Sequence, residues 1–513
     1  MKTYKIGTRG SLLAVTQSTL IKNELERLSG DQFELVLIKT QGDQITNKPL
    51  WQLEGKDFFT KELDEALLAG EVDLLIHSYK DLGTERPEGI KLAAITERRF
   101  AHDILIVPQK NIDALVDWEG DFIVGTSSPR RIANITHSLK NYLPGSPALR
   151  CETLRGNLNT RIRKLKDGEY HAITLALAGI ERLAFTEKSS AELTDLLEGM
   201  NYFILPQSIF PSAASQGALG IELSASRNDD GKLLSILSQL SDAKTVEEVV
   251  RERKAFKEYG GGCHLAVGIH VKKIENDIFL HVNAGEVDGQ RVEKKWLEGR
   301  DLPAIKSGKK LFVGLPTSGH PDVICDEYLK KTPETKTLNL SEKHVFVTSM
   351  YCLDTMKASS KAEGVWAAGA KSARDLAARG FWVNGTADSL GTEDLKSLRS
   401  SRALSIIHKN LNSEWIVLTH HTSGSDIGAV VGTYERVKLE TTIDYEMKLK
   451  EVGACFWTSF PQYLAFMEKF PFLKNTEQFC GMGKTWQEFK NAGVAVHPVA
   501  NMQDYYRLGR NEQ

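Results

Sequence analysis

The chain has 513 residues, of which 41% are hydrophobic and 26% charged, and its formal net charge is -2. A chain of this length exceeds a single hydrophobic core and predicts about three to five domains. The balanced charge, without an acidic or basic tail, excludes the usual signatures of nucleic-acid and membrane partners. No apolar run reaches the ~20 residues that a membrane span needs. The opening MKTYKIGTRG lacks a secretory pattern, so we expect a cytoplasmic location.

Strands and helices alternate from the first residues onward. A strand is predicted at 4–8, followed by a helix that Ser11 can cap and whose Ile21, Leu25 and Leu28 share one face. Similar strand-to-helix units are predicted at 72–78, 121–128 and 170–178. This alternation favours an α/β fold with parallel sheets.

Arginines stand at three of these strand-to-helix junctions. Arg9 precedes the Ser11 cap, and Arg130 and Arg131 follow Ser128 and Pro129, which suit the cap and the first helical position. The third junction carries Arg155 and Arg161. A guanidinium group beside free backbone amides binds carboxylates well, and ligands gather where the strands of α/β sheets end. The three junctions together predict a ligand with several carboxylates or phosphates. The alternative for each junction alone is a solvated charge. No Walker A or GxGxxG motif accompanies them, which disfavours nucleotides.

Asp81 follows the strand predicted at 72–78, in the run His77–Asp81. It could simply cap the next turn. Beside an arginine-rich cleft, its carboxylate could instead stabilise a cationic intermediate.

The six cysteines are scattered, with no CxxC pair and no Cys/His cluster at zinc spacing, which predicts free and mostly buried thiols. Cys263 is the exception, because it follows Gly260, Gly261 and Gly262. An accessible thiol on such a loop predicts a nucleophile or an attachment point. No metal is expected.

The polar segment at 298–310 predicts a linker, and a new strand is predicted at 311–315. Beyond it, FVTS at 346–349 and FWTS at 456–459 form a weak repeat, and each is followed by a glycine-rich turn and a helix. The repeat predicts two similar α/β lobes with a cleft between them. Helices starting near Gly369 and Gly483 could bind anions, or the glycines could only permit tight turns. The adjacent His420 and His421 are expected to point in opposite directions.

Residues 3–300 resemble the porphobilinogen deaminase (hydroxymethylbilane synthase) family. The motifs TRGSLLAVTQ, QGD, GKDFFTKELDEALL, DLLIHSYKDL, GTSSPRR, LRGNLNTR and GGGC occur in the family's order and spacing. The resemblance implies a dipyrromethane cofactor bound through a thioether to Cys263. It implies that Asp81 is catalytic and supports the pyrrole nitrogens. It also implies that the acetate and propionate groups of cofactor and substrate are held by Lys80, Ser128, Arg130, Arg131, Arg9, Ser11, Arg155, Arg161 and Arg182, with Lys56 and Phe59 on a mobile loop. Pro129 and Ser215 depart from the residues usual in the family.

Residues 309–505 resemble uroporphyrinogen-III synthase more loosely, through FVTS, AAGAKSARDLAARGF, VVGTYERV, FWTSFPQ and GMGKTWQEF. That family closes two lobes on hydroxymethylbilane, the product expected of the first half. The resemblance implies that Tyr434 assists loss of hydroxyl and that Thr348, Ser349, Thr458, Ser459 and Thr485 line the cleft. The turn at 483–486 departs from the family's usual sequence.

The two resemblances together imply two lobes like those of periplasmic binding proteins plus a small α+β lobe, then two further α/β lobes. The expected deaminase region is 1–305, with lobes at about 1–98 plus 201–223, 103–197 and 228–305. The expected synthase-like region is 309–513, with lobe A at about 309–340 plus 437–513 and lobe B at 341–436. We expect a monomer that acts on porphobilinogen and hydroxymethylbilane. One alternative is that the first half binds carboxylates without catalysis. The other is that the second half only docks onto or stabilises the first half and has no activity.

Overall fold

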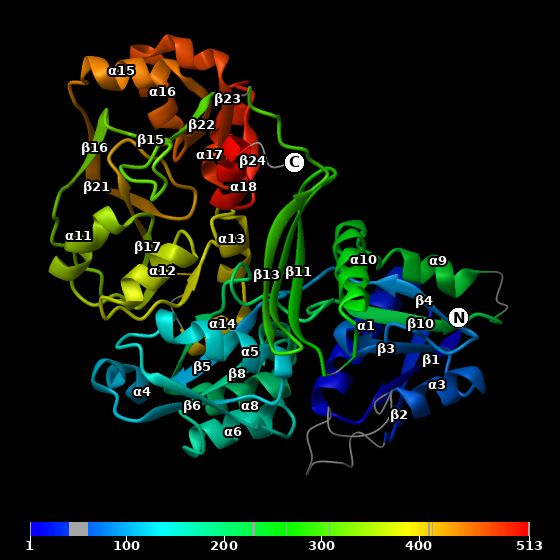
Figure 1. The fold of residues 1–513 in the computed structure, drawn as a ribbon. Helices are drawn as coiled ribbons and strands as arrows, with labels where there is room; N and C mark the ends of the chain where they lie inside the picture. The colour runs from blue at the N-terminus through cyan, green and yellow to red at the C-terminus, as the bar shows by residue number, and fades with distance from the viewer. Residues whose placement is uncertain are drawn as a thin grey trace. The chain divides into compact units, whose positions relative to one another are not determined.

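The computed structural model describes residues 2–40, 60–227, 231–262, 264–306, 308–408, 411–412 and 414–510 (Figure 1). The chain divides into two compact units. The first contains Met1–Lys273, Val282–Lys294 and Leu398–Leu411, and the second contains Ile274–His281, Lys295–Ser397 and Asn412–Gln513. These alternating segments mean that the chain passes between the units five times, whereas the sequence predicts one passage near residue 305.

The first unit contains two five-stranded sheets, ordered β2-β1-β3-β10-β4 and β7-β6-β8-β5-β9. In each sheet the first three strands are parallel, and the fourth, β10 or β5, is antiparallel to its neighbours. The first sheet comprises β1 (Thr3–Arg9), β2 (Gln32–Ile38), β3 (Leu74–Ser78), β4 (Ile90–Ile95) and β10 (Leu219–Ser224). The second comprises β5 (Asp103–Pro108), β6 (Asp121–Gly125), β7 (Ala148–Glu152), β8 (Ala172–Ala176) and β9 (Met200–Ile204).

The prediction of parallel sheets is therefore wrong for β5 and β10. These are the strands by which the chain enters each sheet from the other, so neither follows a crossover helix within its own sheet. The predicted lobe boundaries also shift, because residues 200–204 pair with β5 in the second sheet. The chain rejoins the first sheet only at Leu219.

Helices follow the strands as the sequence predicts. Helix α1 (Leu12–Ser29) begins after Ser11, whose Oγ accepts a hydrogen bond from the amide of Ala14, and it buries Ile21 and Leu25 against the first sheet. The other helices of the first unit that position the site are α3 (Lys61–Leu68), α5 (Pro129–Ser138), α6 (Leu158–Lys166), α7 (Leu177–Leu183), α8 (Glu187–Leu197) and α10 (Ala243–Glu258), together with the short turn η2 (Tyr79–Asp81).

A three-stranded sheet follows α10, with β11 (Ala266–Glu275), β12 (Ile278–Val287) and β13 (Gln290–Glu298) in that order. Two-residue turns join the strands, and Asn276, Asp288 and Gly289 in these turns have positive φ, as tight hairpins require. Beyond β13 the predicted linker is irregular, but Leu302 and Ile305 pack against a core of the second unit.

The second unit contains a parallel sheet ordered β15-β14-β22-β23-β24 and a sheet ordered β16-β21-β20-β17-β18-β19, in which only β16 is antiparallel to its neighbour. The first comprises β14 (Lys310–Val313), β15 (Val323–Cys325), β22 (Val452–Trp457), β23 (Glu477–Gly481) and β24 (His497–Val499). The second comprises β16 (Leu329–Pro333), β17 (His344–Val347), β18 (Gly364–Ala367), β19 (Gly385–Thr386), β20 (Trp415–His420) and β21 (Ala429–Lys438). Strand β16 was expected in lobe A, but it belongs to the sheet of lobe B.

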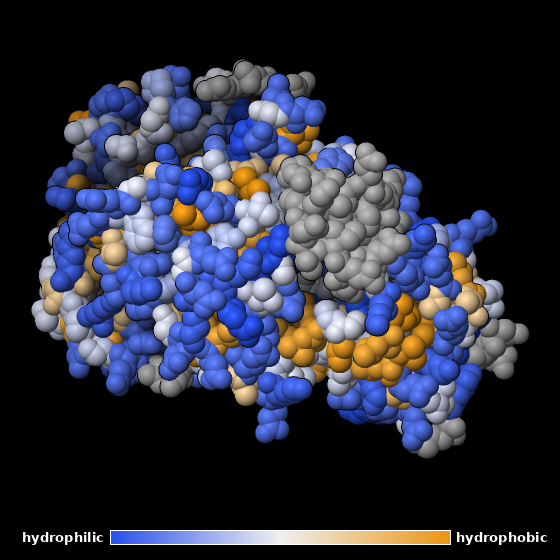
Figure 2. Space-filling view, turned by 90° about the horizontal axis from the view of Figure 1, so that it is seen from below, coloured by the Kyte–Doolittle hydropathy of each residue, from blue (hydrophilic) through white to orange (hydrophobic). Residues whose placement is uncertain are grey.

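The predicted repeat is visible in these sheets. FVTS ends β17 and precedes α12 (Ala370–Ala377), and FWTS ends β22 and precedes α17 (Lys484–Asn491). The core of the first sheet is rich in aromatic residues, including Phe312, Trp457 and Phe466. The surface seen in Figure 2 is largely hydrophilic, with apolar areas interrupted by polar ones. Among the described residues, no helix combines the length and apolar character that crossing a membrane requires.

Candidate functional site

The arginines of the first unit lie at the carboxyl ends of its strands. Arg9 is the last residue of β1, and Arg130 and Arg131 occupy the first turn of α5. Ser128 stands at the N-cap position of α5, although its side chain makes no capping bond there. The last of the three junctions follows β7, where Asn157 caps α6. The positions predicted from the motifs are therefore confirmed, while the roles of the side chains remain predictions.

Asp103, the first residue of β5, balances two of these arginines. Its carboxylate oxygens lie 2.7 Å from Arg130 Nη1 and 2.7 Å from Arg131 Nη2, and its side chain is almost fully buried. Burial opposes ionisation of Asp103, but the two guanidinium groups together have the larger effect and hold its pKa well below the usual range. Arg130 also donates to the carbonyl of Pro211. Asp103 was not predicted from the sequence. The one feature that could have revealed it is an acidic residue at the start of an otherwise apolar, fully buried strand.

Gln216 links this ion cluster to the first sheet. Its Nε2 donates to Asp103 Oδ1 (2.9 Å), and its Oε1 accepts from Lys80 Nζ (3.1 Å). Burial lowers the pKa of Lys80 to about 8; the neighbouring Asp81 opposes that fall, and Arg131 adds to it. Lys80 and Arg131 therefore share one polar network, although Lys80 lies on the turn after β3 and Arg131 on α5.

Asp81 ends η2, directly after β3, and its side chain is exposed. Its charge raises the pKa of Arg161 and of Arg182 against larger opposing effects. Burial and neighbouring cations lower the pKa of each guanidinium to about 10. Arg161 Nε donates to the carbonyl of Gly156 (2.8 Å), and Arg182 Nη2 donates to that of Gly217 (2.6 Å). The carboxylate thus lies within electrostatic reach of both arginines.

Cations outnumber carboxylates in this region. Burial also lowers the pKa of Arg130 and Arg155, and the repulsion of other cations contributes at Arg130. Asp81 and Asp103 offset part of this positive charge. Partly buried cations that repel one another raise the free energy of the folded state unless an anion binds among them. A polycarboxylate therefore fits the donor set, and guanidinium forks suit carboxylate groups.

The loop after α10 has a backbone conformation that requires glycine at three positions. Gly260, Gly261 and Gly262 have φ values of 92°, 61° and 92°, a region that side-chain-bearing residues rarely adopt. Cys263 itself lies outside the described residues, as do Lys56 and Phe59. Of the five described cysteines, all are free and three are buried.

Four of the five described thiols are poor nucleophiles. Burial raises the pKa of Cys455 and of Cys480 to about 12, and it also raises the pKa of Cys151 and of Cys352. Because the thiolate is the reactive form, these four side chains are suited to packing rather than covalent chemistry. Cys263 on the glycine loop therefore stays the predicted attachment point.

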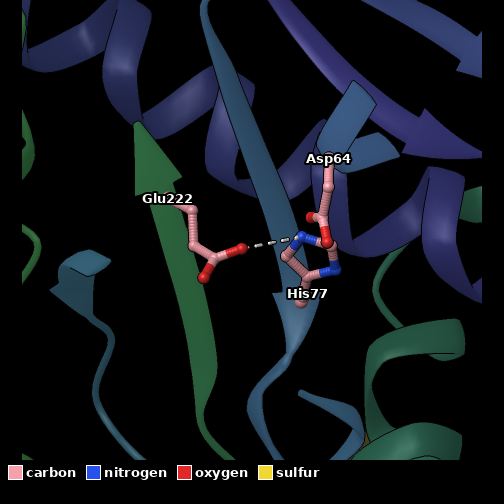
Figure 3. Close-up of side chains that lie close together, drawn as sticks. All are labelled: Asp64, His77 and Glu222. Carbon is pink, nitrogen blue, oxygen red and sulfur yellow. Dashed lines mark ion pairs between the residues drawn. The ribbon is translucent and has the colours of Figure 1, made fainter. Parts of the chain in front are cut away.

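His77 on β3, Glu222 on β10 and Asp64 on α3 form a buried cluster (Figure 3). The three side chains are close enough to hold a metal ion. Arg86, however, contacts Asp64 Oδ1 at 2.5 Å and Glu222 Oε1 at 2.7 Å. Burial, with the charges of Arg86 and Arg9, lowers the pKa of His77 to about 3. Both carboxylates are already neutralised by a guanidinium group, so the cluster serves as an ion pair that fixes α3 to the sheet.

In the second unit, Tyr434 lies on β21 and is almost fully buried. Its ring centroid lies 5.6 Å from that of Tyr351 and 5.4 Å from that of His420. Burial raises the pKa of Tyr434, and Thr348 contributes a hydrogen bond that lowers it. His421 points away and contacts Glu334 at 2.6 Å, so the two adjacent histidines do point in opposite directions.

The hydroxyl groups of the second FWTS turn gather around one glutamine. Thr458 Oγ1 donates to Gln462 Oε1 (2.8 Å), and Ser459 Oγ accepts from the amide of Gln462. Thr485 donates to the carbonyl of Thr458 (3.2 Å). In the first repeat, Thr348 donates to the carbonyl of Leu418, and Ser349 Oγ accepts from a backbone amide. All five predicted hydroxyls therefore already have protein partners.

Two cations near Tyr434 were missed from the sequence. Lys331 on β16 and Arg436 on β21 are directly opposite each other in the antiparallel pair, where like charges repel. Arg436 Nη2 donates to Ser459 Oγ (2.9 Å). Burial and Arg436 lower the pKa of Lys331 to about 8. No carboxylate of the described residues forms an ion pair with either cation, so the pair is suited to an anionic ligand.

The glycines of the two repeats are explained by packing. A Cβ at Gly369 would lie 2.2 Å from Ser389 Oγ, and a Cβ at Gly483 would lie 2.7 Å from Ser389 O. Neither residue has a positive φ. Close approach to Ser389, rather than a tight turn, therefore requires glycine at both positions.

The first unit thus belongs to the class of α/β proteins that hold a polyanionic group at the ends of their strands. A family model described as "Porphobilinogen deaminase, dipyromethane cofactor binding domain" matches residues 4–232. Porphobilinogen deaminase from Synechococcus elongatus is 34% identical over 333 residues, which cover 64% of this chain and 97% of that protein. The enzyme from Trichlorobacter lovleyi is 37% identical, covering 64% and 98%, and that from Gloeobacter violaceus is 39% identical, covering 62% and 92%.

The chain belongs to the porphobilinogen deaminase family. Its N-terminal part contains the dipyrromethane cofactor-binding domain and has the hydroxymethylbilane synthase (transferase) function of porphyrin biosynthesis. Among solved structures, the OxyR2 regulatory domain from Vibrio vulnificus covers 47% of this chain and 96% of its own, with 13% identity and a TM-score of 0.25.

Proposed function

We propose that the first unit joins four porphobilinogen molecules, with release of ammonia, on a dipyrromethane attached to Cys263. The observation that carries this proposal is the excess of buried cations around Asp81. Each porphobilinogen brings two carboxylates, so a growing chain needs many cationic partners. A bound dipyrromethane would supply the free pyrrole carbon for the first addition, and each added pyrrole would supply the carbon for the next.

The residues divide by their place in the network. Arg130 and Arg131, which pair with Asp103, and Lys80, which Gln216 links to it, would hold the carboxylates of the cofactor. Ser128 at the start of α5 would assist them. The groups at the other junctions would hold incoming substrate: Arg9, Ser11, Arg155, Arg161 and Arg182. Lys56 and Phe59 would contribute from the segment outside the described residues.

Asp81 is the proposed catalytic residue. Loss of ammonia from porphobilinogen leaves a positively charged pyrrole, and a fixed carboxylate beside it lowers the barrier. Asp81 has this carboxylate on a short turn whose backbone is tied to β10, since the amide of Tyr79 donates to the carbonyl of Ala218. Arg161 and Arg182 would meanwhile hold the substrate carboxylates and keep the pyrrole nitrogen facing Asp81.

The test is the intact mass of the full chain after limited porphobilinogen is added. The wild-type protein should show successive additions, whereas Asp81→Ala should keep the starting adduct and add units at least tenfold more slowly. Glu85→Ala, which removes an exposed carboxylate nearby, is the matched control. Additions to Asp81→Ala at the wild-type rate would remove Asp81 from the mechanism.

For the second unit we propose cyclisation of hydroxymethylbilane to uroporphyrinogen III, with inversion of the last ring. The support is a buried tyrosine beside Lys331 and Arg436, two cations that repel each other. Neither forms an ion pair among the described residues, although Asp326 and Glu488 act on them at longer range. The cations would bind side-chain carboxylates of the bilane, and Tyr434 would assist departure of its hydroxyl. Thr348, Ser349, Thr458, Ser459 and Thr485 would contact the ligand or orient these groups.

The alternative for the second unit is a docking region without catalysis. Full-length protein supplied with porphobilinogen discriminates between the two, because hydroxymethylbilane closes without an enzyme to the type I isomer. We expect mainly the type III isomer from the wild-type chain and at least tenfold less from Tyr434→Phe. Tyr351→Phe, which alters the neighbouring ring, is the control. Type I alone from the wild-type chain would support the docking alternative.

A further inference from the structure

A segment from late in the chain is packed into the first unit. Residues 398–411 belong to that unit, although the residues on both sides of the segment belong to the second. The segment contains the short helix α14 (Arg402–Ile407), which contacts α7, α8 and β9 (Figure 1). Ser401, Ala403 and Leu404 are almost completely buried there.

Glu181 on α7 is the centre of this contact, and its side chain is 1% exposed. Its carboxylate accepts hydrogen bonds from Ser401 Oγ (2.6 Å) and from the amides of Arg402 (3.2 Å) and Ala403 (3.0 Å). Ser401 Oγ in turn accepts from the amide of Leu404 (3.2 Å). The first amides of a helix have no partner within the helix. Here a carboxylate and a serine from two distant parts of the chain satisfy three of them.

Side chains on either side extend the contact. The guanidinium group of Arg402 lies 4.4 Å from the ring centroid of Phe185, within the range of a cation–π interaction. The ring centroids of Tyr202 and His408 are 4.8 Å apart. Burial lowers the pKa of His408 to about 4, so the ring is neutral at pH 7. The segment and the surface that receives it are thus complementary: the carboxylate of Glu181 faces the helix start, and the rings of Phe185 and Tyr202 face Arg402 and His408.

We infer that residues 398–411 are a docking arm of the deaminase unit, with Glu181, Phe185 and Tyr202 as its receiving surface. The family match at 4–232 contains this surface but not the arm. A buried carboxylate without its donors costs several kcal/mol, so the first unit is incomplete without the arm. Cutting the chain near residue 305 removes the arm and leaves Glu181 unpaired.

The arm also bears on the candidate site, because Glu181 and Arg182 are neighbours on α7. Arg182 fixes this helix through the carbonyl of Gly217, and Glu181 fixes it through the arm. The segment that leaves and re-enters the second unit therefore holds the same helix that carries a site cation.

Hydrogen exchange of the full-length protein tests the arm. In the wild-type chain the amides of 402–407 should be protected; in Glu181→Ala they should exchange at least tenfold faster, together with those of α7. Ser401→Ala, which removes one donor and one acceptor, should give a smaller increase. Glu187→Ala on the exposed start of α8 is the matched control, and helix α12 is the internal reference.

Two results would overturn the inference. One is fast exchange of 402–407 in the wild-type chain, and the other is unchanged protection in both Glu181→Ala and Ser401→Ala. If Glu181→Ala fails to fold, Ser401→Ala alone decides, because it preserves the carboxylate and deletes only a hydroxyl. These measurements need no substrate, so they are independent of the catalytic proposals.

Discussion

The two candidate sites of this chain use cations in different ways. In the first unit, arginines follow the ends of β-strands, and the buried Asp103 offsets two of them. In the second unit, Lys331 and Arg436 lie opposite each other on paired strands, and among the described residues neither forms an ion pair; Asp326 and Glu488 act on them only at longer range. The first arrangement provides a counter-charge for two of its cations before a ligand arrives. In the second arrangement, the repulsion between the two cations persists until an anionic ligand binds. We therefore expect the stability of the second site to depend more on bound ligand.

The largest expected effect comes from Asp103→Asn, which removes the counter-charge of the first site. Two buried guanidinium groups would lose their partner, and breaking such a buried pair costs about 3–5 kcal/mol. We expect the free energy of unfolding to fall by that amount in denaturant titrations. Asp117→Asn, which changes an exposed carboxylate, should have no measurable effect. Equal stability of both variants would show that Asp103 does not balance the arginines.

The matching change in the second unit is Arg436→Gln, which should leave the fold intact. Losing a charge-assisted hydrogen bond to a ligand is worth about 1.5–3 kcal/mol, so the rate of type III formation should fall by roughly 10- to 100-fold. Lys331→Gln should act in the same direction. Lys330→Gln, on the exposed side of β16, is the control. Unchanged isomer ratios in both cation variants would exclude these cations from ligand binding.

A pH profile sharpens the comparison within the first site. Burial lowers the pKa of Lys80 from 10.5 to about 8, so its positive charge is lost as pH rises through about 8. We expect porphobilinogen consumption to decline on that alkaline side. Lys80→Arg should keep its charge and move the decline to higher pH, because arginine stays protonated. An identical alkaline limb in both proteins would assign it to another group.

The smallest effect concerns Ser215, a residue that departs from the glycine usual in the family. Its φ is 65°, in the left-handed region, and its buried hydroxyl has no hydrogen-bond partner. Ser215→Gly should therefore stabilise the protein, by about 1 kcal/mol. Ser212→Gly, in the same segment without a positive φ, should destabilise it. Thermal unfolding distinguishes the two; destabilisation by Ser215→Gly would show that no strain is stored there.

Sequence reasoning placed the arginines of the first candidate site because these residues follow strand ends in compact motifs. It placed Arg9, Arg130 and Arg131 correctly at their junctions. It did not find Asp103 or Gln216, because their partners are distant in sequence and only the packed sheets bring them together. Lys331 and Arg436 were missed for a similar reason, since strand register, not a motif, puts them opposite each other.

The fold was predictable where periodicity and helix caps decide it. Ser11 and α1 are examples, and so are the strands before each arginine junction. The antiparallel β5 and β10 were not predictable, because strand direction depends on where the chain crosses between sheets. The docking of residues 398–411 was also beyond sequence reasoning. Its decisive contact, Glu181 with Ser401, joins residues 220 positions apart.

The attachment of the cofactor at Cys263 is the central claim and has one direct measurement. Intact mass of the purified full-length protein should show a covalent dipyrrole adduct, and Cys263→Ser should lack it while Cys151→Ser keeps it. A fully active Cys263→Ser protein with no adduct at any residue would contradict the account.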